Sequence, residues 1–301
     1  MAVYDIIVIG GGPAGLTAAL YARRANKSVL ILEKGAFGGQ ITFSPKVENI
    51  PGFLSLSGNE FADHLVEQVL EQGAEVEVCE VTAIRDGDPK TVVTDCGEFE
   101  GKAVIIATGA KHRRLGLERE EQFIGDGISF CAVCDGAFYQ GKTVAVIGGG
   151  NSALQEAILL SEQCKKVIVV QNLDTLTGEQ KLRDILAARP NVEIILGTVV
   201  DAILGENTLT GIRVKRVADN TLTDLAVDGM FVAIGLIPQN EPFANLIKLN
   251  SYGYADVDES CTTGTPGIFV AGDCRSKKIR QVTTAASDGA IAALAACDYV
   301  G

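Results

Sequence analysis

Two cysteines separated by two residues are the side chains best suited to chemistry in this sequence. Cys131 and Cys134 lie in the segment ISFCAVCDGAFYQGK, and Asp135 directly follows the second cysteine. If Cys131 begins a helix, this spacing places both sulfurs on one face, and the helix N-terminus stabilises a thiolate. Asp135 is then a candidate proton donor. We therefore predict a redox-active pair, the alternative being two unrelated buried thiols.

The remaining cysteines and the histidines favour neither a disulfide scaffold nor a metal site. Eight cysteines in 301 residues are too sparse for a disulfide framework, and the CxxC occurs once. The chain has only two histidines, His64 and His112. A structural zinc site would therefore lack ligands at suitable spacing, and we expect no metal.

The N-terminal segment has the pattern of a dinucleotide-binding turn. In YDIIVIGGGPAG an apolar run leads into glycines, and the helical pattern LTAALYARRA follows. Gly10 permits a tight turn, Gly12 lets the backbone approach a pyrophosphate, and Gly15 allows close helix packing. The next apolar run ends at Glu33, 18 residues after Gly15. An acid at this distance can accept a hydrogen bond from a ribose hydroxyl, so the full fingerprint is present.

A second copy of this pattern begins 138 residues after the first. TVAVI leads into GGGNSA at 148–153, then into a helical pattern and the apolar run VIVV at 167–170. A duplicated Rossmann unit predicts either two nucleotide pockets or one pocket and one unit that has lost its ligand.

The residues after the second VIVV run argue against tight NADPH binding. A 2′-phosphate is usually held there by cations, but residues 171–180 contain no Lys or Arg and two acids, Asp174 and Glu179. Two missing charge-assisted contacts would cost on the order of 10²–10⁴-fold in affinity. NADH remains open, since Gln171 or Asp174 could meet a ribose hydroxyl.

Composition excludes several classes of function. The 26 basic and 38 acidic side chains give a net charge of −12, so no overall field attracts nucleic acid or an anionic membrane. No apolar run approaches the roughly 18 residues of a membrane span, and the N-terminus lacks the features of a secretory signal. We expect a cytoplasmic protein that binds neither nucleic acid nor membrane, with a length suited to two domains.

Six segments, in the same order, resemble those of the low-molecular-weight flavoprotein thioredoxin reductases. They are GGGPAG at 10–15, GGQI at 38–41, VENIPGF at 47–53, ATGA at 107–110, CAVCDG at 131–136, and GIFVAGDC with RQVTTAASDG between 267 and 289. The resemblance covers essentially the whole chain. It implies an α/β fold of two Rossmann-like, doubly wound nucleotide-binding domains, the second inserted into the first.

The resemblance also implies domain boundaries and an assembly. An FAD-binding domain would consist of residues 1–112 and 241–301, and residues 113–240 would form an NAD(P)H-binding-like domain that carries the CxxC. The enzyme would be a homodimer that reduces thioredoxin. Of the two sulfurs, Cys134 would be the one nearer the flavin, and Cys131 would attack the thioredoxin disulfide.

The implied FAD site is assembled from both ends of the chain. The first fingerprint would bind the FAD pyrophosphate, and Glu33 the ribose of the adenosine. The implied contacts are Gly10, Gly12, Pro13, Ala14, Gly15, Glu33, Lys34, Gly39, Gln40, Asn49, Val81, Ala107, Gly109, Gly272, Asp273, Arg280, Gln281 and Val282.

The chain departs from the NADPH-dependent members after its second Rossmann strand. Those enzymes carry an HRRxxxR-type segment there, and none of it is retained between Gln171 and Thr177. The chain most closely resembles the ferredoxin-dependent flavin thioredoxin reductases, which lack that segment. The resemblance therefore implies that ferredoxin reduces the FAD. The alternatives are an NADH- or NADPH-dependent thioredoxin reductase, a dithiol oxidase of the same fold, and a flavin-binding redox sensor.

An acidic chain needs a local basic patch to bind an acidic ferredoxin. Two clusters are candidates for this docking surface: Lys111, Arg113 and Arg114 after ATGA, and Lys277, Lys278 and Arg280 near the C-terminal flavin segment.

Overall fold

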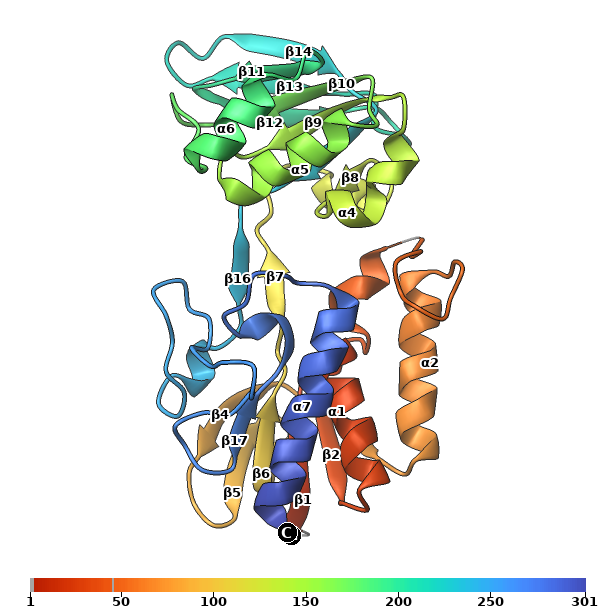
Figure 1. Cartoon of the computed structure of the whole chain (residues 1–301), viewed down its shortest axis with the longest axis vertical. Coiled ribbons are helices and arrows are strands. Elements are labelled where there is room, and N and C mark those ends of the chain that lie inside the picture. Colours follow the sequence, from red (N-terminus) through yellow and green to blue (C-terminus); the bar gives the residue numbers. More distant parts are fainter. Residues whose placement is uncertain (1–2, 45) are drawn as a thin grey trace. The chain divides into compact units, whose positions relative to one another are not determined.

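The chain forms two structural units, and the second is inserted into the first. The structure is a computed structural model, which describes residues 3–44 and 46–301. Unit 1 consists of Met1–Lys111 and Ile237–Gly301, and unit 2 of His112–Leu236. The chain crosses between units at β7 (Ala110–His112) and β16 (Leu236–Pro238), which pair with each other as a two-stranded sheet (Figure 1). Because of this pairing, the second boundary lies at 236/237 rather than at the expected 240/241.

Unit 1 is built around a parallel sheet whose spatial order is β3-β2-β1-β6, with β17 also paired to β6. The strands are β1 (Val3–Ile9), β2 (Val29–Glu33), β3 (Glu75–Val78), β6 (Gly97–Ile106) and β17 (Ile268–Val270). The last of them comes from the C-terminal part of the chain, so both parts of unit 1 share one sheet.

An antiparallel hairpin extends this sheet. It is formed by β4 (Val81–Arg85) and β5 (Lys90–Thr94), and β5 pairs with the first half of β6. The second half of β6 pairs with β17 instead, from Val104 to Ile106.

The α-helices of unit 1 in the described residues are α1 (Pro13–Arg24), α2 (Gly58–Glu71) and α7 (Val282–Val300). Helices α1 and α7 lie side by side, as Figure 1 shows. Their contact is close because small residues line it: a Cβ added at Gly289 would lie 2.1 Å from the carbonyl oxygen of Ala14. Short 3₁₀ turns complete the unit at η1 (Gly39–Phe43), η3 (Glu241–Phe243) and η4 (Gly272–Cys274).

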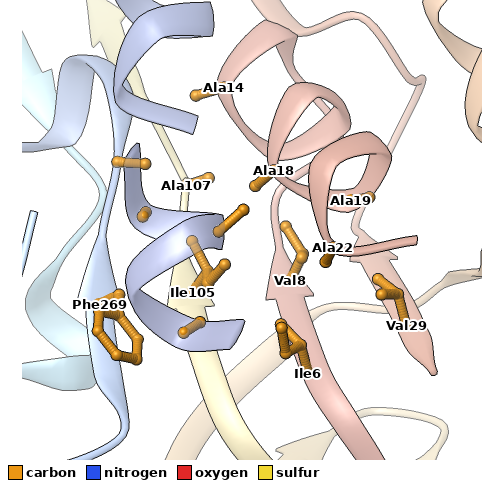
Figure 2. Packing of buried hydrophobic residues seen from close by; sticks show 14 of the residues in the cluster. Ile6, Val8, Ala14, Ala18, Ala19, Ala22, Val29, Ile105, Ala107 and Phe269 are labelled. Carbon is orange, nitrogen blue, oxygen red and sulfur yellow. The ribbon is translucent and has the colours of Figure 1, made fainter. Parts of the chain in front are cut away.

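The core between these helices and the sheet is apolar and tightly packed. Ala18 and Ala22 of α1 lie toward Val8 and Ile105 of the strands in Figure 2, and all four are fully buried. Alanines bring α1 close to the sheet, and this packing fixes the start of the helix at the end of β1.

Unit 2 repeats the parallel-sheet architecture with the order β11-β10-β9-β15-β8. Its strands are β8 (Ile128–Ser129), β9 (Thr143–Ile147), β10 (Lys166–Val170), β11 (Val192–Ile195) and β15 (Gly229–Val232). The expectation of two Rossmann-like units, the second inserted into the first, is therefore confirmed.

A separate antiparallel sheet and several short helices complete unit 2. The sheet consists of β12 (Thr198–Leu204), β13 (Gly211–Arg216) and β14 (Leu222–Ala226). The helical elements are α3 (Glu120–Phe123), α4 (Ala132–Asp135), η2 (Gly136–Tyr139), α5 (Asn151–Ser161) and α6 (Gln180–Ala187). Within the described ranges, no helix combines the length and apolar character that a membrane crossing requires.

Candidate active site

Cys131 and Cys134 form a disulfide at the start of α4 in unit 2. Cys131 is the N-cap residue, Cys134 lies in the single turn that follows, and their Cα atoms are 5.3 Å apart. The backbone N–H of Cys134 donates a hydrogen bond to Cys131 Sγ at 3.2 Å. Both cysteines are half-buried, and Val133 between them is 63% exposed. Because α4 has only four residues, a Cys131 thiolate would be stabilised by this local N–H rather than by a helix dipole.

Asp135 lies beside the disulfide in a partly desolvated position. Its Oδ2 accepts a hydrogen bond from the Ser129 hydroxyl at 2.5 Å, and Ser129 Oγ in turn accepts one from the Cys131 N–H at 3.1 Å. Its Oδ1 is buried and has no hydrogen-bond partner among the described residues. Burial raises the pKa of Asp135, and the Ser129 hydrogen bond partly opposes that rise. The side chain is thus suited to hold a proton close to the sulfurs.

A second buried carboxyl group, Glu156, belongs to the same region and was not foreseen from the sequence. A Cβ on Gly136 would meet Leu160 and Gln163 of the α5 region at 3.2 and 2.6 Å, which places that helix face against the residue following Asp135. Glu156 lies one turn before Leu160 on this face, and α4 packs against α5 (Figure 1). Its Oε2 is buried without a hydrogen-bond partner in the described ranges.

The environment of Glu156 keeps it protonated at neutral pH. Burial raises its pKa to about 8, and the negative charge of Asp135 contributes to the rise. The region around the disulfide therefore contains two carboxyl groups that bind protons more tightly than they would in water.

The free energy of unfolding is expected to carry a component that falls as pH rises from about 5 to about 8. Over that range the folded chain retains the Glu156 proton while the unfolded chain releases it, so raising the pH favours unfolding. Glu156→Gln should remove this component. Urea unfolding of both chains at several pH values measures it, with Glu162→Gln at the end of the same helix as control. Parallel stability curves for wild type and Glu156→Gln would contradict the assignment.

The glycine turn of unit 1 is shaped by close backbone contacts. Gly10 has φ +110°, and a Cβ on it would lie 2.4 Å from the carbonyl oxygen of Ala107. A Cβ on Gly15 would lie 1.9 Å from the carbonyl oxygen of Gly10, so helix α1 can begin here only with glycine at that position. A Cβ on Gly12 would have its nearest neighbours at 4.0 Å. Space is therefore left in front of the first turn of α1.

The first turn of α1 is open to an anion. Gly12 is the N-cap, Pro13 occupies the first turn, and within the described ranges no side chain caps the helix. The free N–H groups of such a turn bind phosphate oxygens. Glu33, at the end of β2, accepts hydrogen bonds from the N–H groups of Gly11 (2.7 Å) and Gly35 (3.0 Å). Its remaining lone pairs stay available for a hydroxyl group.

The other residues expected around a flavin nucleotide come together from distant parts of the chain. Asn49 Nδ2 donates a hydrogen bond to Gln281 Oε1 at 3.2 Å across 232 residues of sequence. A Cβ on Gly272 would lie 2.7 Å from Ala14 Cβ, so η4 packs directly on the start of α1. The guanidinium of Arg280 lies 4.2 Å from the centre of the Tyr254 ring.

The structure gives contacts or positions in elements for five of the expected residues. Gln40 donates to the carbonyl of Ala110, Lys34 pairs with Glu80 at 3.4 Å, and Arg280 Nε donates to the Asp273 carbonyl at 3.4 Å. Val81 begins β4, and Val282 begins α7.

Buried polar atoms without hydrogen-bond partners and glycines with open space make this region a candidate ligand site. Asp273 Oδ1 and Thr108 Oγ1 are buried without a hydrogen-bond partner in residues 3–44 and 46–301. Burial raises the pKa of Asp273. A Cβ on Gly109, with φ +67°, would meet nothing within 4 Å, and one on Gly39 would approach only Gly12, at 3.4 Å. These features fit a bound dinucleotide whose polar groups complete the hydrogen bonds.

The second glycine turn, in unit 2, is hydrogen-bonded to residues 177–179 of the same unit. The N–H groups of Thr177 and Gly178 donate to the Gly149 carbonyl at 2.8 and 2.9 Å. Asn151, the first residue of α5, donates from Nδ2 to Glu179 Oε1 at 3.0 Å, and its Oδ1 accepts from the Glu179 N–H at 2.7 Å. A carboxylate therefore lies by the first turn of α5, where a nucleotide pyrophosphate would otherwise bind.

Gln171 does not lie open to an NADH ribose. Its side chain is only 5% exposed, and its Nε2 donates to the Thr175 carbonyl at 3.3 Å. A Cβ on Gly149 would meet the Gln171 side chain at 2.5 Å. The Asp174 carboxylate lies next to Gly197: its Oδ1 would be 2.8 Å from a Cβ on that glycine.

One of the two basic clusters is smaller than the sequence suggests. The side chain of Lys277 is 7% exposed, and its Nζ pairs with Asp288 at 2.8 Å. Asp288 also pairs with Arg275 at 2.7 Å, so Lys277 belongs to a buried charge network rather than to a docking surface. Lys278 is exposed, as are Lys111 and Arg113 of the first cluster.

The sequence predicted no disulfide framework, and the pairing of two cysteines outside the CxxC was not foreseen. Cys79 and Cys96 form a second disulfide, with Cα atoms 6.0 Å apart. The hairpin register places the two residues opposite each other, and the sequence alone carries no signal for that pairing. The other four cysteines are free and buried.

Comparisons with known proteins give consistent results along the whole chain. Residues 4–289 match the family described as pyridine nucleotide-disulphide oxidoreductase. A Clostridium pasteurianum protein described as a 34.2 kDa protein in the rubredoxin operon is 44% identical, the match covering 99% of this chain and 97% of that protein. Thioredoxin reductase of Listeria monocytogenes is 40% identical over 99% of this chain and 94% of its own length. A crystal structure of thioredoxin reductase from Streptococcus pyogenes superimposes with a TM-score of 0.94 at 42% identity, covering 99% and 98% of the two chains.

Proposed function

This chain belongs to the thioredoxin reductases of the pyridine nucleotide-disulphide oxidoreductase family, and from that premise we propose that it is an FAD-dependent enzyme whose electron donor is ferredoxin. Bound FAD would supply a carrier that accepts single electrons and passes on a pair. The same resemblance supports a homodimeric, cytoplasmic enzyme.

The residues of unit 1 would hold the cofactor. The first turn of α1, with Gly12 as its N-cap, offers N–H groups to the pyrophosphate. Glu33 would accept a hydrogen bond from the adenosine ribose. Asp273 has a buried oxygen with no hydrogen-bond partner among the described residues, and it would accept a hydrogen bond from the nucleotide.

The disulfide of unit 2 would then carry the electron pair to thioredoxin. The Cys131–Cys134 bond accepts two electrons and two protons and becomes a dithiol, and Asp135 holds or donates a proton beside Cys134. The Cys131 thiolate attacks the thioredoxin disulfide and forms a mixed disulfide, which releases one thioredoxin thiol. Cys134 then attacks Cys131 Sγ, which releases the second thiol and restores the Cys131–Cys134 bond.

The lack of cations after the second Rossmann strand is the observation that supports ferredoxin as donor. Residues 171–180 have no basic side chain. The Glu179 carboxylate, bonded to Asn151, lies by the turn that would bind a pyrophosphate. Ferredoxin is energetically sufficient as donor, because a ferredoxin near −400 mV that reduces a disulfide near −270 mV releases roughly 6 kcal/mol for two electrons.

Anaerobic mixing of the oxidised holoprotein with NADPH, NADH or reduced ferredoxin tests the donor. We expect reduced ferredoxin alone to bleach the visible flavin absorption, and added thioredoxin to restore it. Bleaching by either nicotinamide at physiological concentration would refute ferredoxin dependence. Bleached protein that thioredoxin fails to reoxidise would favour a redox sensor instead.

A further inference from the structure

The second disulfide, Cys79–Cys96, lies in unit 1 and takes no part in the proposed transfer of electrons to thioredoxin. Cys79 lies in the connection between β3 and β4, and Cys96 in the turn between β5 and β6. Cys79 is 3% exposed, whereas Cys96 is exposed on the surface. One sulfur of the pair is thus accessible to a reagent from solution.

This disulfide closes the open end of the β4–β5 hairpin. Val81 is paired with Thr94 at the last position of the ladder. One step further, the Asp95 N–H donates to the Glu80 carbonyl at 3.1 Å, and the Glu80 N–H donates to Asp95 Oδ1 at 2.8 Å. Cys79 and Cys96 are the next facing pair, at a separation suited to a cross-strand disulfide.

The closed end of this hairpin is attached to the nucleotide site. The Cys79 N–H donates to the Glu33 carbonyl at 2.9 Å, and the Glu33 carboxylate in turn accepts from the Gly11 N–H of the glycine turn at 2.7 Å. The neighbouring Glu80 pairs with Lys34 at 3.4 Å. The disulfide therefore restrains the backbone at Cys79 and Glu80, and this backbone helps to hold Glu33 and Lys34 in position.

We propose that Cys79–Cys96 is an exchangeable disulfide that stabilises the adenosine end of the FAD site, and that a dithiol protein of the thioredoxin class opens it. The effect on FAD rests on the proposed function, whereas the disulfide and its exchange do not. Since the proposed reaction produces reduced thioredoxin, the enzyme's own product would act on this site.

The exchange follows ordinary thiol chemistry. A thiolate of the dithiol attacks the exposed Cys96 Sγ, the bond to Cys79 breaks, and Cys79 leaves as a thiolate that takes up a proton. The second thiol of the partner attacks its own sulfur in the mixed disulfide and releases Cys96 as a thiol. The partner is oxidised to a disulfide, and Cys79 and Cys96 gain two electrons and two protons in total.

Peptide mapping tests the bond directly in the holoprotein. Free thiols are blocked with iodoacetamide, and the protein is digested with trypsin without reduction. Cys79 lies in the tryptic peptide 47–85 and Cys96 in 91–102, whereas Cys131 and Cys134 share one peptide, 120–142. We expect 47–85 joined to 91–102, and separation of the two after incubation with reduced thioredoxin. The proposal would be refuted if Cys79 and Cys96 were alkylated in protein isolated without reductant. It would also be refuted if reduced thioredoxin left the link between the two peptides intact.

Release of FAD tests the consequence and is read by the fluorescence of the free cofactor after dilution. Cys96→Ser and the thioredoxin-treated wild type are expected to release FAD roughly tenfold faster than the oxidised wild type, because the hairpin end is no longer restrained. Glu98→Gln is the matched control, since it breaks the Arg85–Glu98 pair on the same hairpin and leaves both cysteines in place. Equal release rates for Cys96→Ser and wild type would refute the effect on the site.

Two further outcomes separate this proposal from its alternatives. A metal ion could also be bound here, by Cys79, Asp95 and Cys96 together. If reduced wild type contained stoichiometric zinc and Cys96→Ser contained none, the pair would be a metal site and the proposed exchange would be refuted. A protein that carries the 47–85/91–102 link but no FAD would refute the proposed function and leave the exchangeable disulfide standing.

Discussion

A Cys131→Ser chain is expected to accept electrons from its donor as well as wild type does and to reduce thioredoxin at least about 10⁴-fold more slowly. Loss of the attacking sulfur removes the covalent step, whereas the FAD site of unit 1 contains neither Cys131 nor any residue of α4. Flavin bleaching and thioredoxin reduction measured on the same sample separate the two half-reactions. Thioredoxin reduction that survives in Cys131→Ser would refute this role.

The partner variant distinguishes the two sulfurs. Cys134→Ser keeps the Cys131 thiol and the backbone N–H that donates to it, so it should attack thioredoxin whose active-site cysteine carries a thionitrobenzoate leaving group. The products are one equivalent of thionitrobenzoate and a stable mixed disulfide, because no Cys134 thiol remains to resolve it. Cys131→Ser should form no such complex, and the opposite pattern would reverse the assigned roles. Cys164→Ser, which alters a buried free thiol of the same unit, is the control.

The nucleotide turn could be predicted from sequence because its requirements are local. A Cβ on Gly15 would meet the carbonyl of Gly10, only five residues earlier, so backbone sterics alone select glycine at that spacing. The same holds for the CxxC, where one helical turn brings Cys131 and Cys134 together. Patterns of this kind do not depend on how the rest of the chain packs.

The features that sequence did not predict depend on contacts between distant segments. Lys277 reads as a surface cation until α7 brings Asp288 to 2.8 Å from it. Glu156 lies in an ordinary amphipathic pattern, and its high pKa arises only when α4 packs against α5 and buries the carboxyl group. The Cys79–Cys96 pairing follows from the register of two strands, which spacing in the sequence does not specify.

Asp135→Asn is expected to slow thioredoxin reduction by about 10²-fold while leaving the disulfide and the fold intact. The amide matches the carboxyl group in size and can still accept the Ser129 hydrogen bond, but it cannot exchange a proton with the sulfurs. Asp126→Asn is the matched control, because it neutralises an exposed acid of the same unit. A wild-type rate in Asp135→Asn would exclude this carboxyl group as the proton donor.

A second substitution, Ser129→Ala, shifts the pKa of Asp135 and keeps the carboxyl group in place. The Ser129 hydroxyl lowers that pKa against the larger effect of burial, so Ser129→Ala should raise it further. If the protonated carboxyl group delivers the proton, the decline in rate at high pH should shift to higher pH in Ser129→Ala and disappear in Asp135→Asn. A rate that instead rises with pH, with the rise displaced to higher pH in Ser129→Ala, would mean that Asp135 acts as a base in the rate-limiting step. Rate profiles of the three chains between pH 5 and 9, recorded with the same donor, therefore determine the direction of proton transfer at the disulfide.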